Sequence, residues 1–185
     1  DGSFESPSYL VYTCMSDGSF GAWTISQDYC ILISNNCDDD AGTCSGNNCY
    51  CAPDGVQMMH VHGNCATSSG SISQTITTEV GQFYELEFMA AGGTWDGSDS
   101  AEQFDVTVSG ASTVLDESLY TTGSVQNNVW DVYSLTFTAD STATTLRFYQ
   151  ASGCLNLDKV YVSPTTASPS LTPVPTTAPT AAPTT

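Results

Sequence analysis

Short segments of alternating polar and apolar residues run through most of this chain from residue 70 onward. The clearest lie at 71–77, 83–89, 104–108, 133–138, 145–149 and 157–162. Alternation with a period of two residues is typical of half-buried antiparallel strands, and no window has convincing helical periodicity. Further candidate strands lie at 22–25, 29–33 and 56–61. About eight to ten short strands, separated by turns rich in Gly, Asn, Asp and Ser, predict an all-β antiparallel sandwich of the jelly-roll type.

The even number of cysteines predicts an exported protein stapled by four disulfides. The eight residues are Cys14, Cys30, Cys37, Cys44, Cys49, Cys51, Cys65 and Cys154, and the sequence leaves their pairing open. A zinc site is the alternative, because His60 and His62 follow Cys49 and Cys51. Structural zinc sites use cysteines separated by two to four residues, however, and here only one residue separates them. Disulfides are therefore favoured.

Residues 37–51 form a cysteine-rich insert with four cysteines, three consecutive aspartates and hardly any apolar side chain. Such a segment buries too little apolar area to offset its ordering entropy. Cross-links worth about 2–4 kcal/mol each are the expected source of its order.

The charge of the chain is strongly one-sided. Two fixed cations, Arg147 and Lys159, stand against 20 carboxylates, and the net charge is −18. A field of this sign repels phosphate backbones and anionic lipid, so nucleic acid and membrane surfaces are disfavoured as partners. Divalent cations and neutral polymers such as glycans remain compatible. No run of about 18 apolar residues is present, so we expect no membrane span. The cysteine count and the lysine-poor, Ser/Thr-rich composition lead us to expect a secreted protein of the cell surface or matrix.

The composition changes abruptly after Val162. Residues 163–185 contain six prolines and eleven Ser or Thr, with no charge and no aromatic ring. This predicts a β-sandwich domain at 1–162 and a polyproline II-like stalk at 163–185, which at about 3.1 Å per residue would reach roughly 70 Å. Pro interleaved with Ser and Thr is typical of O-glycosylated segments, and a disordered linker is the alternative. The expected acceptors are Thr165, Thr166, Ser168, Ser170, Thr172, Thr176, Thr177, Thr180, Thr184 and Thr185.

Several motifs resemble the galactose-binding-like β-sandwich superfamily, in particular its secreted, wall-associated and surface-anchored domains and the related carbohydrate-binding modules. They are the opening residues 1–5, Trp23, the block 70–86, Trp130 before 134–139, and residues 157–160. The resemblance covers most of positions 1–163, apart from the insert. It implies that Trp23 and Trp130 pack in the core, and it says little about function because this fold carries sugar-binding, adhesive and spacer domains alike.

The resemblance also implies a structural calcium ion. In the related modules the glutamate of the opening motif and the aspartate of the last strand hold this ion with backbone carbonyls, and the matching residues here are Glu5 and Asp158. Calcium takes about six to eight oxygen ligands, and such an ion would fasten the two ends of the domain together. Ordinary surface carboxylates are the alternative. A second, weaker calcium candidate is the loop run Asp38, Asp39 and Asp40.

The sequence offers no catalytic constellation. His60 and His62 would share one face of a strand, with no third ligand evident, so a solvent-facing position is expected. A nucleophile motif of the type G-x-S-x-G is absent. Twenty carboxylates supply so many pairs that no pair indicates a glycosidase. We therefore expect a protein that is not an enzyme.

Sugar binding needs an exposed aromatic ring with polar groups nearby. Trp95 lies in the polar stretch 92–99, and Tyr120 is assigned to another loop. Either residue would serve as a sugar platform or as an anchor at a protein contact. The sequence thus predicts an extracellular structural or adhesive subunit, in a fibre or matrix and able to self-assemble. The alternatives are a carbohydrate-binding module for a neutral polysaccharide, and one repeat of a larger surface adhesin.

Overall fold

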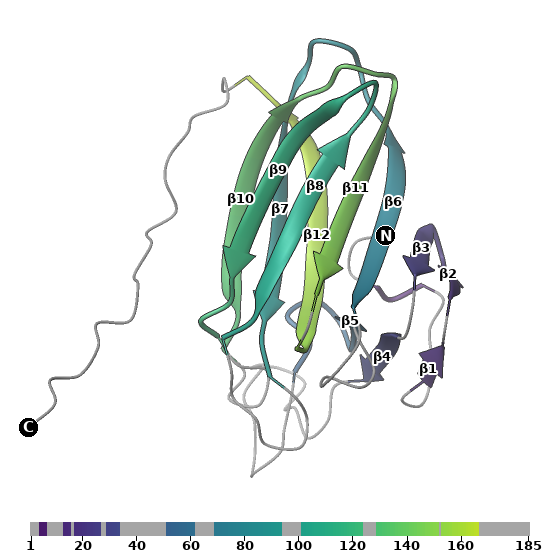
Figure 1. The fold of residues 1–185 in the computed structure, drawn as a ribbon, viewed down its shortest axis with the longest axis vertical. Coiled ribbons are helices and arrows are strands. Elements are labelled where there is room, and N and C mark those ends of the chain that lie inside the picture. The colour runs from purple at the N-terminus through teal and green to yellow at the C-terminus, as the bar shows by residue number, and fades with distance from the viewer. Residues whose placement is uncertain are drawn as a thin grey trace, which may run out of the picture.

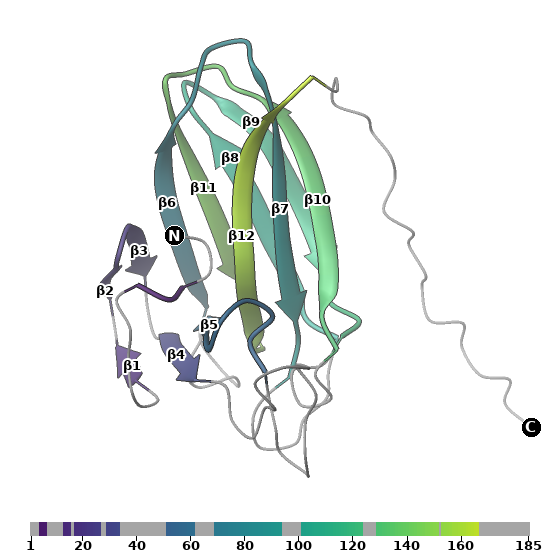
Figure 2. The ribbon, with the colours of Figure 1, turned by 180° about the vertical axis from the view of Figure 1, so that it is seen from behind.

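The structure is a computed structural model, and it describes residues 4–6, 13–15, 17–26, 29–33, 51–61, 69–93, 101–123, 129–151 and 153–166. The described residues fold into two sheets of six strands each, and neighbouring strands in both sheets are antiparallel. We call them sheet A, which contains β7, β10 and β12, and sheet B, which contains β6, β8, β9 and β11. Figure 1 shows sheet B in front, and Figure 2 shows sheet A in front, from the opposite side.

Sheet A has the strand order β1 (Thr13–Met15), β4 (Tyr29–Ile33), β5 (Gln57–Val61), β12 (Leu155–Thr165), β7 (Phe83–Ala91) and β10 (Asp131–Thr138). Sheet B has the order β2 (Gly18–Phe20), β3 (Trp23–Ser26), β6 (Gly70–Thr77), β11 (Ala143–Gln150), β8 (Gln103–Ser109) and β9 (Thr113–Tyr120).

The prediction of an all-β antiparallel sandwich is confirmed. Every segment predicted as a strand overlaps an observed one, and the described residues contain no helix. The neighbouring segments 71–77 and 83–89 lie in different sheets, because the chain crosses the sandwich between β6 and β7. One expectation was wrong: Tyr120 ends strand β9 and does not lie in a loop. No helix long and apolar enough to cross a membrane occurs in the part of the chain that the structure describes.

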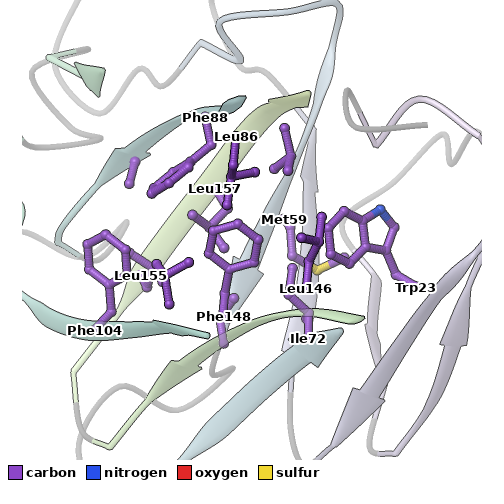
Figure 3. Packing of buried hydrophobic residues seen from close by; sticks show 14 of the residues in the cluster. Trp23, Met59, Ile72, Leu86, Phe88, Phe104, Leu146, Phe148, Leu155 and Leu157 are labelled. Atoms are coloured by element: carbon purple, nitrogen blue, oxygen red, sulfur yellow. The ribbon is translucent and has the colours of Figure 1, made fainter. Parts of the chain in front are cut away.

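Aromatic rings fill the centre of the sandwich, as Figure 3 shows. The ring of Phe88 on β7 stands edge-on to Phe148 on β11, with 5.0 Å between ring centroids, and to Phe104 on β8, with 6.1 Å. All three side chains are buried, and edge-to-face packing of this kind adds about 0.5–1.5 kcal/mol per pair to the burial of the rings. Contacts between β7 and the strands of sheet B therefore hold the two sheets together.

Of the two tryptophans expected in the core, Trp23 is 2% exposed and joins the main cluster. Trp130 is only partly buried, and it packs against a small separate cluster around Met58 and Ala91. The expectation for Trp23 is confirmed, whereas Trp130 lies at the margin.

One long side of the sandwich is only partly closed. Strand β3 pairs with β6 only at Ser71–Ser73, and β5 pairs with β12 only at Leu155–Leu157. Phe4 covers the lower part of this side: it is fully buried, its ring lies 5.4 Å from that of Trp23, and its carbonyl accepts a 2.7 Å hydrogen bond from Nε2 of Gln57. The upper halves of β6 and β12 have no strand on this edge within the described residues.

Candidate functional site

The outer face of sheet B is a polar surface that three adjacent strands build row by row. Antiparallel register places Tyr149 of β11 opposite Asp105 of β8, and Asp105 opposite Ser118 of β9. The next row is Arg147, Thr107 and Asp116. Buried residues such as Phe148 and Val106 alternate with them and point into the core, so the strand period brings all six side chains to the outer face.

Arg147 and Tyr149 form a stacked pair at the centre of this face. The guanidinium carbon of Arg147 lies 4.7 Å from the centroid of the Tyr149 ring, which is within the range of a cation–π contact. Arg147 is exposed and Tyr149 is partly buried. The guanidinium therefore covers one face of the ring, and the pair presents the rest of the ring together with several N–H donors, the combination that binds a sugar ring and its hydroxyls.

A second tyrosine stands on the same face near the end of β9. Tyr120 is 59% exposed, and it pairs with Gln103 of β8. Since Leu119 is buried, alternation along β9 directs Tyr120 outward. Tyr120 lies two strands across from Tyr149 and one step of two residues along, so the two positions are about 12 Å apart from strand spacings alone. That separation suits an extended oligosaccharide rather than a single sugar.

One carboxylate of this face already accepts a hydrogen bond from a neighbouring side chain. The hydroxyl of Ser118 donates a 2.5 Å hydrogen bond to Oδ1 of Asp105. Arg147 is one of only two fixed cations in the chain, and it shares the face with Asp105 and Asp116. The local charge is therefore near neutral or slightly negative, so the face suits uncharged polar ligands better than anions.

The outer side of sheet A carries a contrasting acidic site. Asp158 on β12 is fully buried, and its carboxylate accepts hydrogen bonds from N–H of Asp54 at 2.9 Å and of Lys159 at 2.7 Å. Oε1 of Glu5 accepts bonds from N–H of Val56 at 2.7 Å and of Gln57 at 2.6 Å. The structure thus gathers the two residues predicted from the sequence, Glu5 and Asp158, around the segment 54–57.

Burial is the main cause that raises the pKa of Asp158 to about 8, and the nearby charges of Asp54 and Glu5 raise it further, while its two backbone hydrogen bonds act in the opposite direction. The hydroxyl of Tyr161 donates a hydrogen bond to Asp54. That bond is the first cause that raises the pKa of Tyr161 to about 12. The site therefore accumulates negative charge around a carboxylate that water does not reach.

The chemistry of this acidic site fits a hard cation. Its donors are carboxylate oxygens, and an ion would offset both the burial and the nearby charges of Asp54 and Glu5, which raise the pKa of Asp158. Its geometry is incomplete for that purpose. Within the described residues no three Asp, Glu, His or Cys side chains are grouped closely enough to hold an ion, because Glu5 and Asp158 are turned toward backbone N–H groups. The ion itself would supply electrostatic cross-linking of Glu5 to Asp158.

Several predicted residues lie outside the described part of the chain. They are Trp95, the run Asp38, Asp39 and Asp40, the cysteines Cys37, Cys44, Cys49 and Cys65, His62, and every proposed O-glycosylation acceptor after Thr166. Cys51 and Cys154 are each disulfide-bonded, and Cys14 pairs in register with Cys30 between β1 and β4. Strand β12 continues to Thr165, three residues beyond the expected end of the domain.

The expectation that His60 faces solvent was wrong. His60 is 1% exposed, and its Nδ1 donates a 2.7 Å hydrogen bond to Oδ1 of the buried Asn156. The amide of Asn156 in turn donates to the carbonyls of Ala91 and Gly93, at 3.2 and 3.1 Å. His60 thus serves a buried polar network that ties β5, β12 and β7 together.

Sequence reasoning missed Tyr149, Arg147 and Asp54. Tyr149 and Arg147 lie within a predicted strand, and their i and i+2 spacing was a usable signal, because it places an aromatic ring and a cation on one face. Asp54 carries no such signal. Its role follows from the approach of the segment 54–57 to β12, which local sequence does not encode.

Comparison with protein families assigns the chain to one family. It belongs to the family described as "Protein of unknown function (DUF642)", whose profile matches residues 1–162. The comparison with curated proteins gives no significant match.

Solved structures of carbohydrate-binding modules share the fold. A CBM22 xylan-binding domain from Paenibacillus barcinonensis has a TM-score of 0.53 at 13% identity, and the match covers 90% of this chain and 94% of that one. A CBM4 module has a TM-score of 0.50 at 15% identity, covering 89% and 97%. A Clostridium thermocellum xylanase fragment complexed with xylohexaose has a TM-score of 0.50 at 14% identity, covering 86% of this chain and 29% of that one. These matches confirm the expected β-sandwich fold.

Proposed function

We propose that this chain is a carbohydrate-binding domain that holds an extended polysaccharide against the outer face of sheet B. The observation that carries the proposal is the stacked pair Arg147 and Tyr149 at the centre of that face, with Tyr120 two strands away. The outer face of sheet B presents an aromatic ring, N–H donors, the hydroxyl group of Ser118 and the carboxylate of Asp105. These are the groups by which proteins bind sugar rings and hydroxyls.

The structural neighbours support the same function at the level of the fold. One is described as a xylan-binding domain, and another was determined with xylohexaose bound. Their identity to this chain is low, so the argument for binding depends on the residues of sheet B and not on the fold.

A neutral polysaccharide is the proposed ligand class. The net charge of −18 opposes the approach of uronates, sulfated glycans and other polyanions. Asp105 and Asp116 beside Arg147 leave no concentrated positive charge to offset that repulsion. Uncharged hydroxyls pay no such electrostatic cost.

The remaining expectations complete the proposal. The domain is secreted, is stapled by four disulfides, is held at Glu5 and Asp158 by calcium, and performs no catalysis. An O-glycosylated stalk with polyproline II character follows it. The uncharged composition of residues 163–185 also favours a second role, that of an adhesive or structural subunit spaced from its neighbours by this stalk.

Binding to a panel of soluble and insoluble neutral and acidic polysaccharides tests the proposal. Wild-type protein should bind at least one neutral polymer, and Tyr149→Ala should weaken that binding about tenfold or more, which corresponds to about 1.4 kcal/mol. Val132→Ala is the matched control, because Val132 is 70% exposed on the outer side of sheet A. Binding that Tyr149→Ala leaves unchanged, or a preference for acidic polymers, contradicts the proposal.

A further inference from the structure

A cleft opens in the partly closed side of the sandwich, away from the face proposed to bind carbohydrate. It has a volume of about 370 Å³, which falls within the range of roughly 300–1,000 Å³ that ligand sites occupy. Its lining combines apolar and polar side chains, with apolar surface slightly in excess. The lining residues are Ile76, Tyr84, Leu146, Val160 and Val162, with Gln74, Thr77 and Tyr161 at polar positions.

This cleft exists because the gap between the two sheets is filled in its lower part but not in its upper part. Phe4 fills the lower part between β3 and β5, as described above, whereas no strand covers the upper halves of β6 and β12 within the described residues. Ile76 and Val162 pack against the main core while remaining partly exposed. Covering them would remove more apolar surface from water, which is favourable.

The C-terminal tail starts at the same end of the molecule. Pro164 lies opposite Tyr84, a lining residue, in the pairing of β12 with β7, and Nε2 of Gln82 donates a 2.9 Å hydrogen bond to the carbonyl of Thr165. The described chain ends at Thr166, and 19 residues, 167–185, follow. The five residues to Leu171 span up to about 17 Å when extended, enough to turn back along β12 to Val162.

The composition of the tail matches the cleft. Leu171 and Val174 are its only apolar residues besides proline and alanine, and the tail has no charge. Polyproline II has three residues per turn, so Leu171 and Val174 would project from the same side, with Thr172 on another. Aromatic-lined grooves are the usual receptors for such segments, and the cleft offers the rings of Tyr84 and Tyr161.

We propose that the segment 167–176 of this chain folds back onto its own domain and docks Leu171 and Val174 in the side cleft. Only the residues beyond this segment then serve as a spacer. A glycan on Ser170 or Thr172 is compatible with docking, because these side chains point away from the cleft, whereas Ser168 is in phase with Leu171 and must then carry no glycan. Tethering gives the segment a millimolar effective concentration, so docking in the same molecule prevails over capture of another copy.

Methyl-resolved NMR of the full chain tests docking directly. The Leu171 and Val174 methyl groups should show ring-current shifts and nuclear Overhauser contacts to the ring of Tyr84, independent of protein concentration. Methyl groups with the shifts of an unstructured peptide overturn the proposal. Contacts seen only between differently labelled copies in a mixed sample also overturn it, because they would identify a second molecule as the occupant.

A pair of substitutions gives an independent readout. Leu171→Ser with Val174→Ser should abolish the contacts and lower Tm by about 2–4 °C. The double variant Ala181→Ser with Ala182→Ser, further along the tail, is the control and should leave Tm unchanged. Both variants lie outside the sandwich, so neither disturbs its folding. Equal Tm values for the first pair and the wild type contradict docking.

Discussion

The two outer faces of the sandwich share one core but carry different chemistry. On sheet B, exposed or partly exposed side chains stand in rows around Arg147 and Tyr149, and most of their polar groups face solvent. On sheet A, the carboxylates of Glu5 and Asp158 accept hydrogen bonds from the backbone of the segment 54–57 and of Lys159. Polar groups on sheet B are therefore available to a polysaccharide, whereas the carboxylates on sheet A bond to the backbone and would bind only the proposed calcium ion.

This difference arises because a described segment covers part of the outer side of sheet A, whereas none covers β11 or β8 of sheet B. Phe4 and the segment 51–56 pack beside β12 and exclude water from Asp158. A buried carboxyl group needs hydrogen-bond partners, and backbone N–H groups supply them here. No described segment packs on β11 or β8 from outside, and their outward side chains keep access to water. Substitutions on sheet A should accordingly change stability, and those on sheet B should change binding.

Removal of calcium from the proposed site on sheet A should have the largest effect. At 100 to 1,000 times its dissociation constant, a bound ion stabilises the fold by about 2.7–4.1 kcal/mol, so chelation should lower Tm by roughly 5–15 °C. Asp158→Ala should abolish this sensitivity, whereas Asp116→Asn on sheet B should preserve it. Calorimetry with and without chelator measures both, and equal Tm values in wild type would rule out the ion.

Acidification of the chelated protein should have a smaller effect of opposite sign, because a proton then relieves the site. Asp158 has a pKa of about 8 in the fold and about 3.9 in an unfolded chain. A raised pKa means that the folded state binds the proton more tightly, so stability declines as pH rises from about 4 toward 8. Tm should thus be higher at pH 5 than at pH 8.

Asp158→Asn isolates the contribution of this carboxyl, since the other carboxylates of the chain also repel one another at high pH. The variant should flatten the difference in Tm between pH 5 and pH 8. An unchanged pH dependence would show that Asp158 is not the group responsible.

The sequence predicted the architecture well because strand alternation is a local property. Nine of the twelve described strands overlap a predicted segment, and the family resemblance correctly placed Trp23 in the core. The three-residue strands β1 and β2 were missed. Strand β9 was missed because it lies at the edge of sheet B, where its residues 113–118 are exposed or only partly buried and blur the alternation. That omission also led to Tyr120 being assigned to a loop.

The candidate sites were less accessible to sequence analysis because they depend on contacts between distant segments. The approach of Glu5 to Asp158 was anticipated through a family resemblance, not from spacing. Asp54 was not anticipated, and neither was the burial of His60, whose partner Asn156 lies 96 residues away. Tyr149 and Ser118 lie in one row because the strands are ordered β11, β8, β9, and this order cannot be predicted from a local sequence pattern.

On sheet B, Arg147→Ala should weaken polysaccharide binding about tenfold, because the guanidinium donates several hydrogen bonds and packs on Tyr149. Arg147→Lys retains the charge but loses the planar donor array, so it should recover only part of the affinity. Titration calorimetry with the best glycan of the panel measures both. Full affinity in Arg147→Lys would show that charge, and not the planar donor set, governs binding.

The smallest effect is expected at the edge of the same face. Tyr120 lies at the end of β9, and its ring would meet only the terminal sugar of a bound chain. Tyr120→Ala should weaken binding of a long oligosaccharide about two- to fivefold, equivalent to roughly 0.4–1 kcal/mol, and should leave the affinity for a disaccharide unchanged. Stability should be unaffected, because the hydrogen bond from the Tyr133 hydroxyl goes to the backbone carbonyl of Tyr120 and survives the substitution. An equal loss for short and long ligands would instead place the primary sugar at Tyr120 and move the centre of the site away from Tyr149.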